Sequence, residues 1–373
     1  MLGRRDVPPV LLLLLLIILI LLTLSQILVV HHGRFRATVR GRGRGRTELR
    51  RLDINLQQLL HQNVPSIDTH RKLLQNERNE ARIRNILHRA SEGTIQISNR
   101  TASNQRCPLI PPNLFGPIRV NTTTQSSDRA SEELEFGGSW RPKDCIARHK
   151  VAVIIPYRDR KEHLTILLSY LHPILQRQQL DYRLFVVEQF GIQTFNKARI
   201  MNVAFIEAAK VYSSSCVVFH DVDLIPEDDR NMYSCPEQPR HMSVAIDEMG
   251  YKLAYEELVG GVLAMRNEHF ELVNGYSNLY WGWGAEDDDI AYRILYSGLV
   301  ISRPPTRIAR YKMVKHTKRK PSDWRKRIRL LYTGTRRLQY DGLNSVQYKL
   351  LSTKLHDSYT HFLVDIGKPP QGF

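Results

Sequence analysis

The chain has 373 residues, long enough for one large domain or two ordinary ones, and 42% of them are hydrophobic. That content is enough for a real core and excludes a chain too polar to fold. The net charge of +17 is spread unevenly, because arginine is concentrated in the first third, most densely in the Arg-Gly run 40–46. That run predicts a solvated linker rather than a site for RNA or an acidic glycan. No RNA-binding pattern accompanies it, so we expect no nucleic-acid partner.

Residues 10–30 are almost wholly apolar, broken only by Thr23, Ser25 and Gln26. About 20 apolar residues are needed to cross a bilayer, so this run predicts a membrane-spanning helix. A cleaved signal peptide is the alternative, but its apolar core would be shorter and would end at small residues, whereas this run ends in Val-Val-His-His. We expect a retained single span at residues 10–30, after a cytoplasmic tail of residues 1–9.

The orientation of the span follows from the residues after it. Arginine is more abundant after the span than before it, and the positive-inside rule alone would keep that side cytoplasmic. N-glycosylation patterns at Asn99 and Asn121 oppose this. So do four cysteines of the kind that pair in an oxidising lumen: Cys107, Cys145, Cys216 and Cys235. We therefore expect a lumenal body at residues 107–373, carried by a stem at residues 31–106.

From residue 107 onward, apolar runs alternate with helical patterns. Buried strands are predicted at 151–156, 184–188 and 216–220, and helices at about 161–176 and 196–210. Strands that recur at about 30-residue spacing with helices between them indicate βαβ units. The predicted fold class is therefore α/β, with a mostly parallel sheet.

Charged residues follow two of these strands. The first strand runs into Pro156-Tyr157-Arg158-Asp159-Arg160, and the third ends in Asp221-Val222-Asp223. Because ligands bind beyond the carboxyl ends of parallel strands, these segments suit a diphosphate and a divalent cation such as Mg²⁺ or Mn²⁺. An isolated Asp-x-Asp is weak evidence and often only caps a loop. Its position directly after a buried strand, opposite arginines, favours the metal site.

The segment Trp281-Gly282-Trp283-Gly284-Ala285-Glu286-Asp287-Asp288-Asp289 combines two aromatic rings, small residues and four carboxylates. A reacting sugar needs an aromatic surface for its C–H groups, acceptors for its hydroxyls and a base for one hydroxyl. The same carboxylates also suit a helix start, because Ile290, Ile294 and Leu295 are apolar at helical spacing and Gly298 follows as a stop. A helix start is a good place for reactive groups, so the two interpretations are compatible.

Together these motifs resemble the β-1,4-galactosyltransferase family over residues 107–373. The resemblance rests on the run 281–289 and on Ile-Pro-Tyr-Arg-Asp-Arg (155–160), Phe-Asn-Lys-Ala (195–198), Phe-His-Asp-Val-Asp (219–223), Gly-Gly-Val (260–262) and Asp-Gly-Leu-Asn (341–344). It implies a GT-A fold in a type II Golgi membrane protein. It also implies a Mn²⁺-dependent, inverting transfer from a UDP-sugar to the 4-hydroxyl of a terminal N-acetylglucosamine or glucose.

By motif position, the resemblance implies the metal ligands Asp223, Met313 and His316. From the residues alone, Met313 would be a core residue, because thioether sulfur suits a hard cation poorly, and His316 would be a surface residue. The resemblance assigns the UDP-sugar ten contacts: Pro156, Arg158, Arg160, Phe195, Lys197, Asp221, Val222, Leu258, Gly261 and Trp283. The family usually has arginine where Lys197 stands, so a fork-like contact becomes a point charge.

The resemblance also separates the roles of the carboxylates. Asp287 matches the family's base and would take the proton from the acceptor 4-hydroxyl, while Glu286 would orient hydroxyls beside it. Asp287, Asp288, Tyr255 and Trp324 would contact the acceptor. The family's usual disulfides imply the pairs Cys107–Cys145 and Cys216–Cys235.

Leu258 bears on the donor sugar. Galactose-using members of the family carry Tyr or Phe at this position, and a smaller residue leaves space for an N-acetyl group. Leu258 therefore favours UDP-N-acetylgalactosamine over UDP-galactose. The main rival function is a non-catalytic lectin or scaffold, which the metal, base and aromatic positions oppose. The acceptor glycan belongs to a glycoprotein, glycolipid or proteoglycan, and the sequence permits a homodimer without indicating one.

Overall fold

The computed structural model describes residues 105–122, 133–316 and 321–371, all of which fall within one compact unit, Ala81–Phe373. The predicted tail and membrane span, Asn99 and nearly all of the predicted stem lie outside the described residues. Within the described ranges, no helix is both long and apolar enough to span a membrane.

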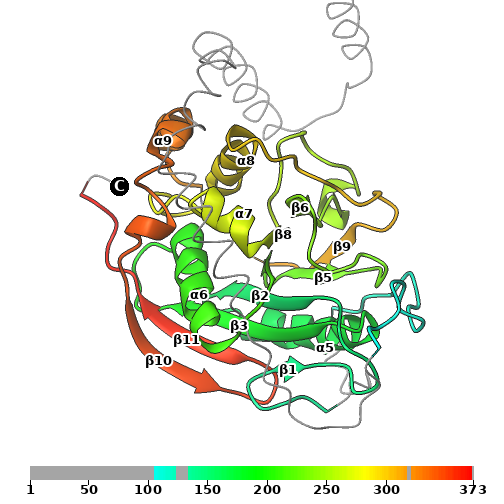
Figure 1. Cartoon of the computed structure of the whole chain (residues 1–373). Helices are drawn as coiled ribbons and strands as arrows, with labels where there is room; N and C mark the ends of the chain where they lie inside the picture. The colour runs from blue at the N-terminus through cyan, green and yellow to red at the C-terminus, as the bar shows by residue number, and fades with distance from the viewer. Residues whose placement is uncertain (1–104, 123–132, 317–320, 372–373) are drawn as a thin grey trace, which may run out of the picture. The chain divides into compact units, whose positions relative to one another are not determined.

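An eight-stranded sheet with the order β10-β11-β3-β2-β4-β8-β6 forms the centre of this unit, and β1 pairs with β3 (Figure 1). The strands are Ser139–Trp140 (β1), Lys150–Tyr157 (β2), Asp181–Gln189 (β3), Cys216–His220 (β4), Arg240–His241 (β6), Val262–Arg266 (β8), Lys349–Leu355 (β10) and Thr360–Asp365 (β11).

The expectation of a mostly parallel sheet is wrong at the edges, because the sheet is mixed. β11, β3, β2 and β4 run parallel, as βαβ units predict, but β1, β6, β8 and β10 each pair antiparallel with a neighbour. β10 and β11 are joined by the short loop 356–359, which is too short for the crossover that parallel neighbours need.

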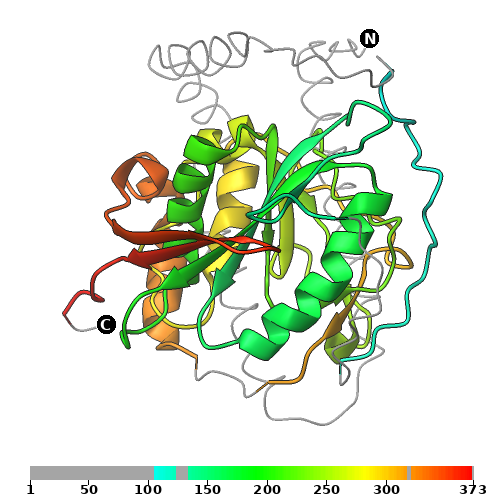
Figure 2. The same ribbon diagram turned by 90° about the horizontal axis from the view of Figure 1, so that it is seen from below.

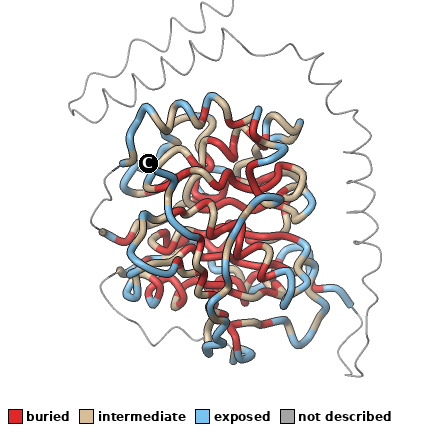
Figure 3. Tube along the Cα trace, turned by 90° about the vertical axis from the view of Figure 1, so that its left-hand side faces the viewer, coloured by how far each residue is buried: buried red, intermediate tan, exposed pale blue. Residues whose placement is uncertain are grey.

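Two hydrophobic layers cover the parallel centre, because side chains alternate between the faces of a strand. On β2, Val151 and Ile155 belong to the same cluster as the buried residues of α5 (Lys161–Arg177). Ile154 belongs to the cluster of α6 (Lys197–Val211). Figure 2 shows the two helices on opposite faces of the sheet, and buried segments run through the centre of Figure 3. The strands and helices predicted between residues 151 and 220 are confirmed.

The remaining elements lie outside the central sheet. They are a three-stranded sheet of β5 (Leu224–Pro226), β9 (Arg310–Met313) and β7 (Ala245–Ile246), the 3₁₀ turns η2 (Asp247–Met249) and η3 (Leu343–Ser345), and the helices α7 (Asn267–Leu272), α8 (Glu286–Tyr296) and α9 (Trp324–Arg337). α8 begins at Glu286 and ends before Gly298, as predicted. Its Leu295 is 46% exposed and so does not belong to the core.

Both disulfides that the resemblance implied are present, Cys107–Cys145 and Cys216–Cys235. The second ties the first residue of β4 to a loop 19 residues further along the chain. A crosslink of this kind restricts the unfolded chain and typically adds about 2–4 kcal/mol to stability.

Candidate active site

Three of the predicted nucleotide contacts, Pro156, Arg158 and Arg160, lie at the end of β2. Residues 157–163, which include Arg158 and Arg160, line a cavity of about 710 Å³. The Arg158 guanidinium lies over the Phe195 ring, 4.8 Å from its centroid, and its Nη1 donates a 2.7 Å hydrogen bond to the Gln193 carbonyl. These contacts hold the Arg158 guanidinium beside the cavity, where its charge favours binding of an anionic ligand.

Strand pairing brings the three predicted metal ligands together. Asp223 immediately precedes β5, in which Leu224 is paired with Met313 of β9. The His316 Nδ1 lies 3.1 Å from the Asp223 Oδ2, and the Val314 N–H donates a 2.8 Å bond to the Asp223 carbonyl. The register of β5 and β9 therefore places a carboxylate, a thioether and an imidazole in one region.

This donor set suits a divalent transition metal better than Mg²⁺ or Ca²⁺, which prefer oxygen ligands. Among the residues that the structure describes, no three His, Cys, Asp or Glu side chains form a group able to hold a metal. A site at Asp223 and His316 would therefore use the Met313 sulfur and further ligands from a bound diphosphate. The residues present fit a metal ion bound in that way.

Lys197 joins the donor side of the site to the carboxylates of α8. From the first turn of α6, its Nζ lies 2.9 Å from the Asp221 Oδ1, 3.4 Å from the Asp287 Oδ2 and 3.8 Å from the Glu286 Oε1. Burial acts to lower the pKa of Lys197, but the three carboxylates outweigh it and hold that pKa well above its ordinary value. Asp221 and Asp287, which are far apart in the sequence, are thus bridged by one ammonium group.

Residues with left-handed backbone position the carboxylates of α8. Gly284 and Ala285, just before the helix, have φ angles of 113° and 74°. The Asp287 carboxylate then lies against Gly260, where an added Cβ would be 2.8 Å from the Asp287 Oδ2 and 3.5 Å from the Leu258 Cδ1. A larger residue at position 260 would push this carboxylate aside, and Leu258 borders the same position.

Burial changes the acidity of three carboxyl groups in the site. It raises the pKa of Glu286 to about 7, with Asp287 adding to the shift and Lys197 opposing it. It raises the pKa of Asp221 to about 6 against the opposing charge of Lys197. It also raises the pKa of Asp288 to about 6, although the Tyr255 hydroxyl donates a 2.7 Å hydrogen bond that favours the carboxylate. Near neutral pH the site therefore holds carboxyl groups that are close to their titration points.

The raised pKa of Glu286 predicts a pH-dependent stability. Burial favours the protonated form of Glu286. This protonation stabilises the folded state fully below pH 4.5, the ordinary pKa of the group, and the stabilisation is lost as pH rises through about 7. The melting temperature of the metal-free wild type should therefore fall relative to that of Glu286→Gln between about pH 5 and about pH 8. Thermal unfolding in a chelator measures this, with the exposed Glu268→Gln as the control. A constant difference between wild type and Glu286→Gln would contradict the raised pKa.

The two tryptophans of the 281–289 run separate between core and surface. Trp281 is 2% exposed and belongs to the cluster under α6, so its part is structural. Trp283 is 57% exposed, and its carbonyl accepts 3.3 Å bonds from the N–H and the hydroxyl of Ser322. Trp324, the first residue of α9, is 52% exposed. One ring of the run and the start of α9 thus offer open aromatic surface for a sugar.

Comparison with known proteins gives the same picture. The model for the N-terminal region of glycosyl transferase group 7 matches residues 107–236, and the model for the N-terminal domain of galactosyltransferase matches residues 240–317. β-1,4-Galactosyltransferase 1 of Mus musculus is 45% identical over 268 residues, covering 70% of this chain and 67% of the relative. The chain belongs to the β-1,4-galactosyltransferase family. β-1,4-Galactosyltransferase 4 of Cricetulus griseus is 41% identical over 284 residues, 75% of this chain and 80% of the relative.

Solved structures of this family share the fold. The catalytic domain of Drosophila β-1,4-galactosyltransferase 7, in complex with xylobiose, matches with a TM-score of 0.52 and 32% identity, over 59% of this chain and 94% of that one. A mutant of the same enzyme, in complex with manganese, UDP-Gal and xylobiose, matches with a TM-score of 0.51. This similarity and the mixed sheet flanked by helices support the GT-A form of the α/β fold.

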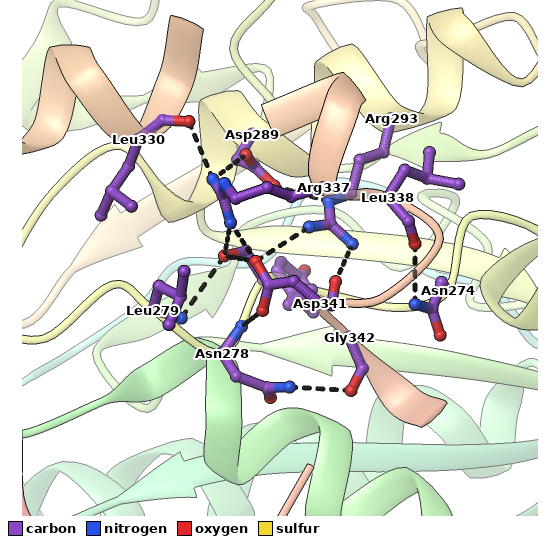
Figure 4. Close-up of polar contacts among 12 residues, drawn as sticks. Asn274, Asn278, Leu279, Asp289, Arg293, Leu330, Arg337, Leu338, Asp341 and Gly342 are labelled. Atoms are coloured by element: carbon purple, nitrogen blue, oxygen red, sulfur yellow. Dashed lines mark hydrogen bonds and ion pairs between the residues drawn. The ribbon is translucent and has the colours of Figure 1, made fainter. Parts of the chain in front are cut away.

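Sequence reasoning missed a buried ion network behind the site of this family member. The Arg293 Nε lies 2.6 Å from the Asp289 Oδ2, and its Nη1 donates a 2.8 Å bond to the Asp341 carbonyl. Arg337 of α9 contacts Asp341 and lies 3.6 Å from Asp289 (Figure 4). All four residues are buried. The available signal was two Asp–Arg pairs spaced four residues apart, at 289 and 293 and at 337 and 341.

Proposed function

We propose that the protein is an inverting, Mn²⁺-dependent β-1,4-glycosyltransferase. It moves galactose or N-acetylgalactosamine from a UDP-sugar to the 4-hydroxyl of a terminal N-acetylglucosamine, or glucose, on a glycoprotein or glycolipid glycan. Family membership supports the reaction class. The binding of manganese, UDP-Gal and xylobiose by a Drosophila relative supports a metal, a UDP-sugar donor and a sugar acceptor.

One observation carries the proposal: Lys197 lies within 3.5 Å of both Asp221 and Asp287. Asp221 lies two residues before Asp223, whose carboxylate is 3.1 Å from the His316 Nδ1. Asp287 is in the first turn of α8 and lies against Gly260. This arrangement, next to the carboxyl end of the parallel strand β4, supports donor, metal and base roles for these residues, because ligands bind at that end of the strands in such sheets.

The chemistry then follows from the groups present. An alcohol is a poor nucleophile near neutral pH, so Asp287 accepts the proton of the acceptor 4-hydroxyl as its oxygen bonds to the anomeric carbon. The bond from that carbon to the UDP oxygen breaks on the opposite face, and its electron pair leaves with the diphosphate, which inverts the centre. Asp223, Met313 and His316 would hold Mn²⁺, which would stabilise negative charge on the leaving diphosphate when bound. Asp288 and Tyr255 orient acceptor hydroxyls, and Trp283 and Trp324 cover sugar C–H surface.

A screen of donors against acceptors tests the proposal. With Mn²⁺ present, transfer of a hexose or N-acetylhexosamine from UDP to the 4-hydroxyl of a terminal N-acetylglucosamine or glucose is the expected result. The product linkage and anomeric configuration are read by NMR. Binding of UDP-sugar and acceptor without any turnover would instead support a lectin with this fold.

Leu258 decides the donor sugar in this proposal. Its Cδ1 and the Asp287 carboxylate both border Gly260, and a leucine leaves more room near C2 of the sugar than tyrosine does. We expect wild type to prefer UDP-N-acetylgalactosamine. Leu258→Tyr should lower kcat/KM for that donor by about 10- to 100-fold, which is the effect of one steric contact in a pocket, and should leave kcat/KM for UDP-galactose unchanged. A wild type that strongly prefers UDP-galactose would refute this part alone.

The proposed setting is the Golgi membrane, with a single span at residues 10–30 and a lumenal body. Asn121 is exposed, as a glycan acceptor must be, and both disulfides fit an oxidising lumen. Protease digestion of sealed Golgi vesicles tests the orientation. A body that is digested without detergent would overturn it.

A further inference from the structure

The solvent-facing side of α9 carries a row of basic residues that the proposed chemistry does not use. Arg325, Arg329 and Arg336 are exposed and lie on one face of the helix, with the half-exposed Tyr332 between them. We call these three arginines the cationic stripe. At about 1.5 Å per residue, the stripe is about 16 Å long. Figure 1 shows α9 on the outside of the unit, beside α8.

The cationic stripe has no counter-charge within the described ranges, because none of its guanidinium groups forms an ion pair there. Residues 321–340 contain a single acidic residue, Asp323, and its carboxylate caps α9 by accepting the Arg325 N–H. Like charges four residues apart destabilise a helix by about 0.2–0.5 kcal/mol per pair. A solvated helix usually mixes both signs, so this one-sided charge is better suited to an anionic partner than to folding.

Aromatic rings lie beside two of these guanidinium groups. The guanidinium carbon of Arg325 lies 5.7 Å from the Trp324 ring centroid, and that of Arg336 lies 5.7 Å from the Tyr332 centroid. Arginine presents a planar fork that matches carboxylate and sulfate oxygens, and stacking on a ring leaves the fork free to bind them. The same exposed rings offer surface to sugar C–H groups.

The cationic stripe begins beside the candidate acceptor site. The Arg327 Nη1 would lie 2.8 Å from a Cβ at Gly284, so the first turn of α9 rests on the 281–289 run. Trp283 pairs with Pro321, three residues before α9. Further along, Gly334 packs against the Asp289 carboxylate. Arg327 and Gly334 lie on the side of α9 opposite the stripe, so only the Arg325 end of the stripe, against Trp324 at the start of the helix, adjoins the candidate acceptor site. A glycan that leaves this site over the start of α9 would bring its inner sugars to the stripe.

We propose that the cationic stripe binds negatively charged groups, sulfate or carboxylate, on the inner sugars of the acceptor glycan. The proposal rests on the proposed transferase function and adds that the natural acceptor is an anionic glycan. A lipid surface fits less well, because Leu331 and Gly334, on the opposite side of α9, are buried in the protein, which leaves little apolar surface to insert into a bilayer.

The test compares two acceptors of equal length that end in N-acetylglucosamine, one neutral and one sulfated on its inner sugars. The variant Arg325→Gln/Arg329→Gln/Arg336→Gln removes the stripe. The control, Lys349→Gln/Lys354→Gln/Lys368→Gln, removes the same charge from exposed positions on and after the β10–β11 hairpin. Melting temperatures show that both variants are folded, and Arg329→Glu alone provides a milder second variant.

Wild type should have a lower KM for the sulfated acceptor than for the neutral one. In the stripe variant, the KM for the sulfated acceptor should rise by about tenfold. The KM for the neutral acceptor, kcat and the control variant should not change, and about 0.5 M salt should remove the preference. Equal KM values for both acceptors in wild type, or the same loss in the control, would overturn the proposal. So would a stripe variant that loses binding to anionic vesicles or to RNA but not to the sulfated glycan.

Equilibrium binding of the two oligosaccharides, measured by calorimetry without donor, separates this proposal from the transferase function. Absence of turnover with stripe-dependent binding of the sulfated glycan would refute the transferase and keep the binding surface. Turnover without stripe-dependent binding would refute the binding surface and keep the transferase function.

Discussion

Replacing Asp287 by asparagine should lower turnover at least about a hundredfold while leaving UDP binding intact. The two side chains have the same shape, so the contact with Gly260 is kept, but an amide cannot accept the proton of the acceptor hydroxyl. Lys197 keeps Asp221 and Glu286 as partners, so the charge on the donor side of the site is largely preserved. Steady-state kinetics give the turnover, and calorimetry with UDP and Mn²⁺ gives the binding.

The matched control for this experiment is Asp357→Asn, an exposed aspartate in the loop between β10 and β11. It should leave both measurements unchanged. Near-normal turnover of Asp287→Asn would show that another group takes the proton. Loss of UDP binding in that variant would show instead that the carboxylate serves the donor side.

Replacing Arg293 by methionine should lower the free energy of unfolding by about 3–5 kcal/mol. Arg293 is fully buried, and its guanidinium contacts the carboxylates of Asp289 and Asp341 and the Gly275 carbonyl. Removing it leaves buried carboxylates with one arginine, Arg337, and an uncompensated buried charge is far costlier than a lost surface contact. Urea unfolding with the disulfides intact measures the change.

Arg307→Met, at an exposed position, is the control and should change stability by less than about 0.5 kcal/mol. A loss below about 1 kcal/mol in Arg293→Met would mean that the ion network contributes little net stability. The network also fixes how α8 is oriented, since Asp289 follows Asp287 by two residues on the same helix. A destabilised variant that still folds at low temperature should therefore also lose turnover.

The sequence predicted the elements whose signal is local. The apolar runs of β2, β3 and β4 and the acidic start and glycine stop of α8 lie within single segments, so their patterns could be recognised. The antiparallel edges were missed because pairing of β8 with β4, or of β10 with β11, depends on contacts and connections that no single segment contains.

The candidate site shows the same division. The resemblance implied that Met313 is a metal ligand, whereas its chemistry alone predicts a core residue. Strand pairing places Met313 opposite Leu224, the residue after Asp223. The bridge from Asp221 through Lys197 to Asp287 joins three segments and could not be derived from any one of them. Trp281 and Trp283 looked equivalent in sequence, and only the packing under α6 separates them.

The place of β11 in the sheet has a consequence for how the chain folds. β11 (Thr360–Asp365) lies between β10 and β3, and its parallel pairing with β3 completes the row of parallel strands. During synthesis, β2, β3 and β4 are made well before this partner, so the outer edge of β3 beyond β2 stays partly unpaired until about residue 365 has left the ribosome. Such long-range pairing slows folding, and an exposed strand edge invites wrong partners in the meantime. Deletions that remove β11 should therefore yield aggregated chains rather than shorter, folded ones.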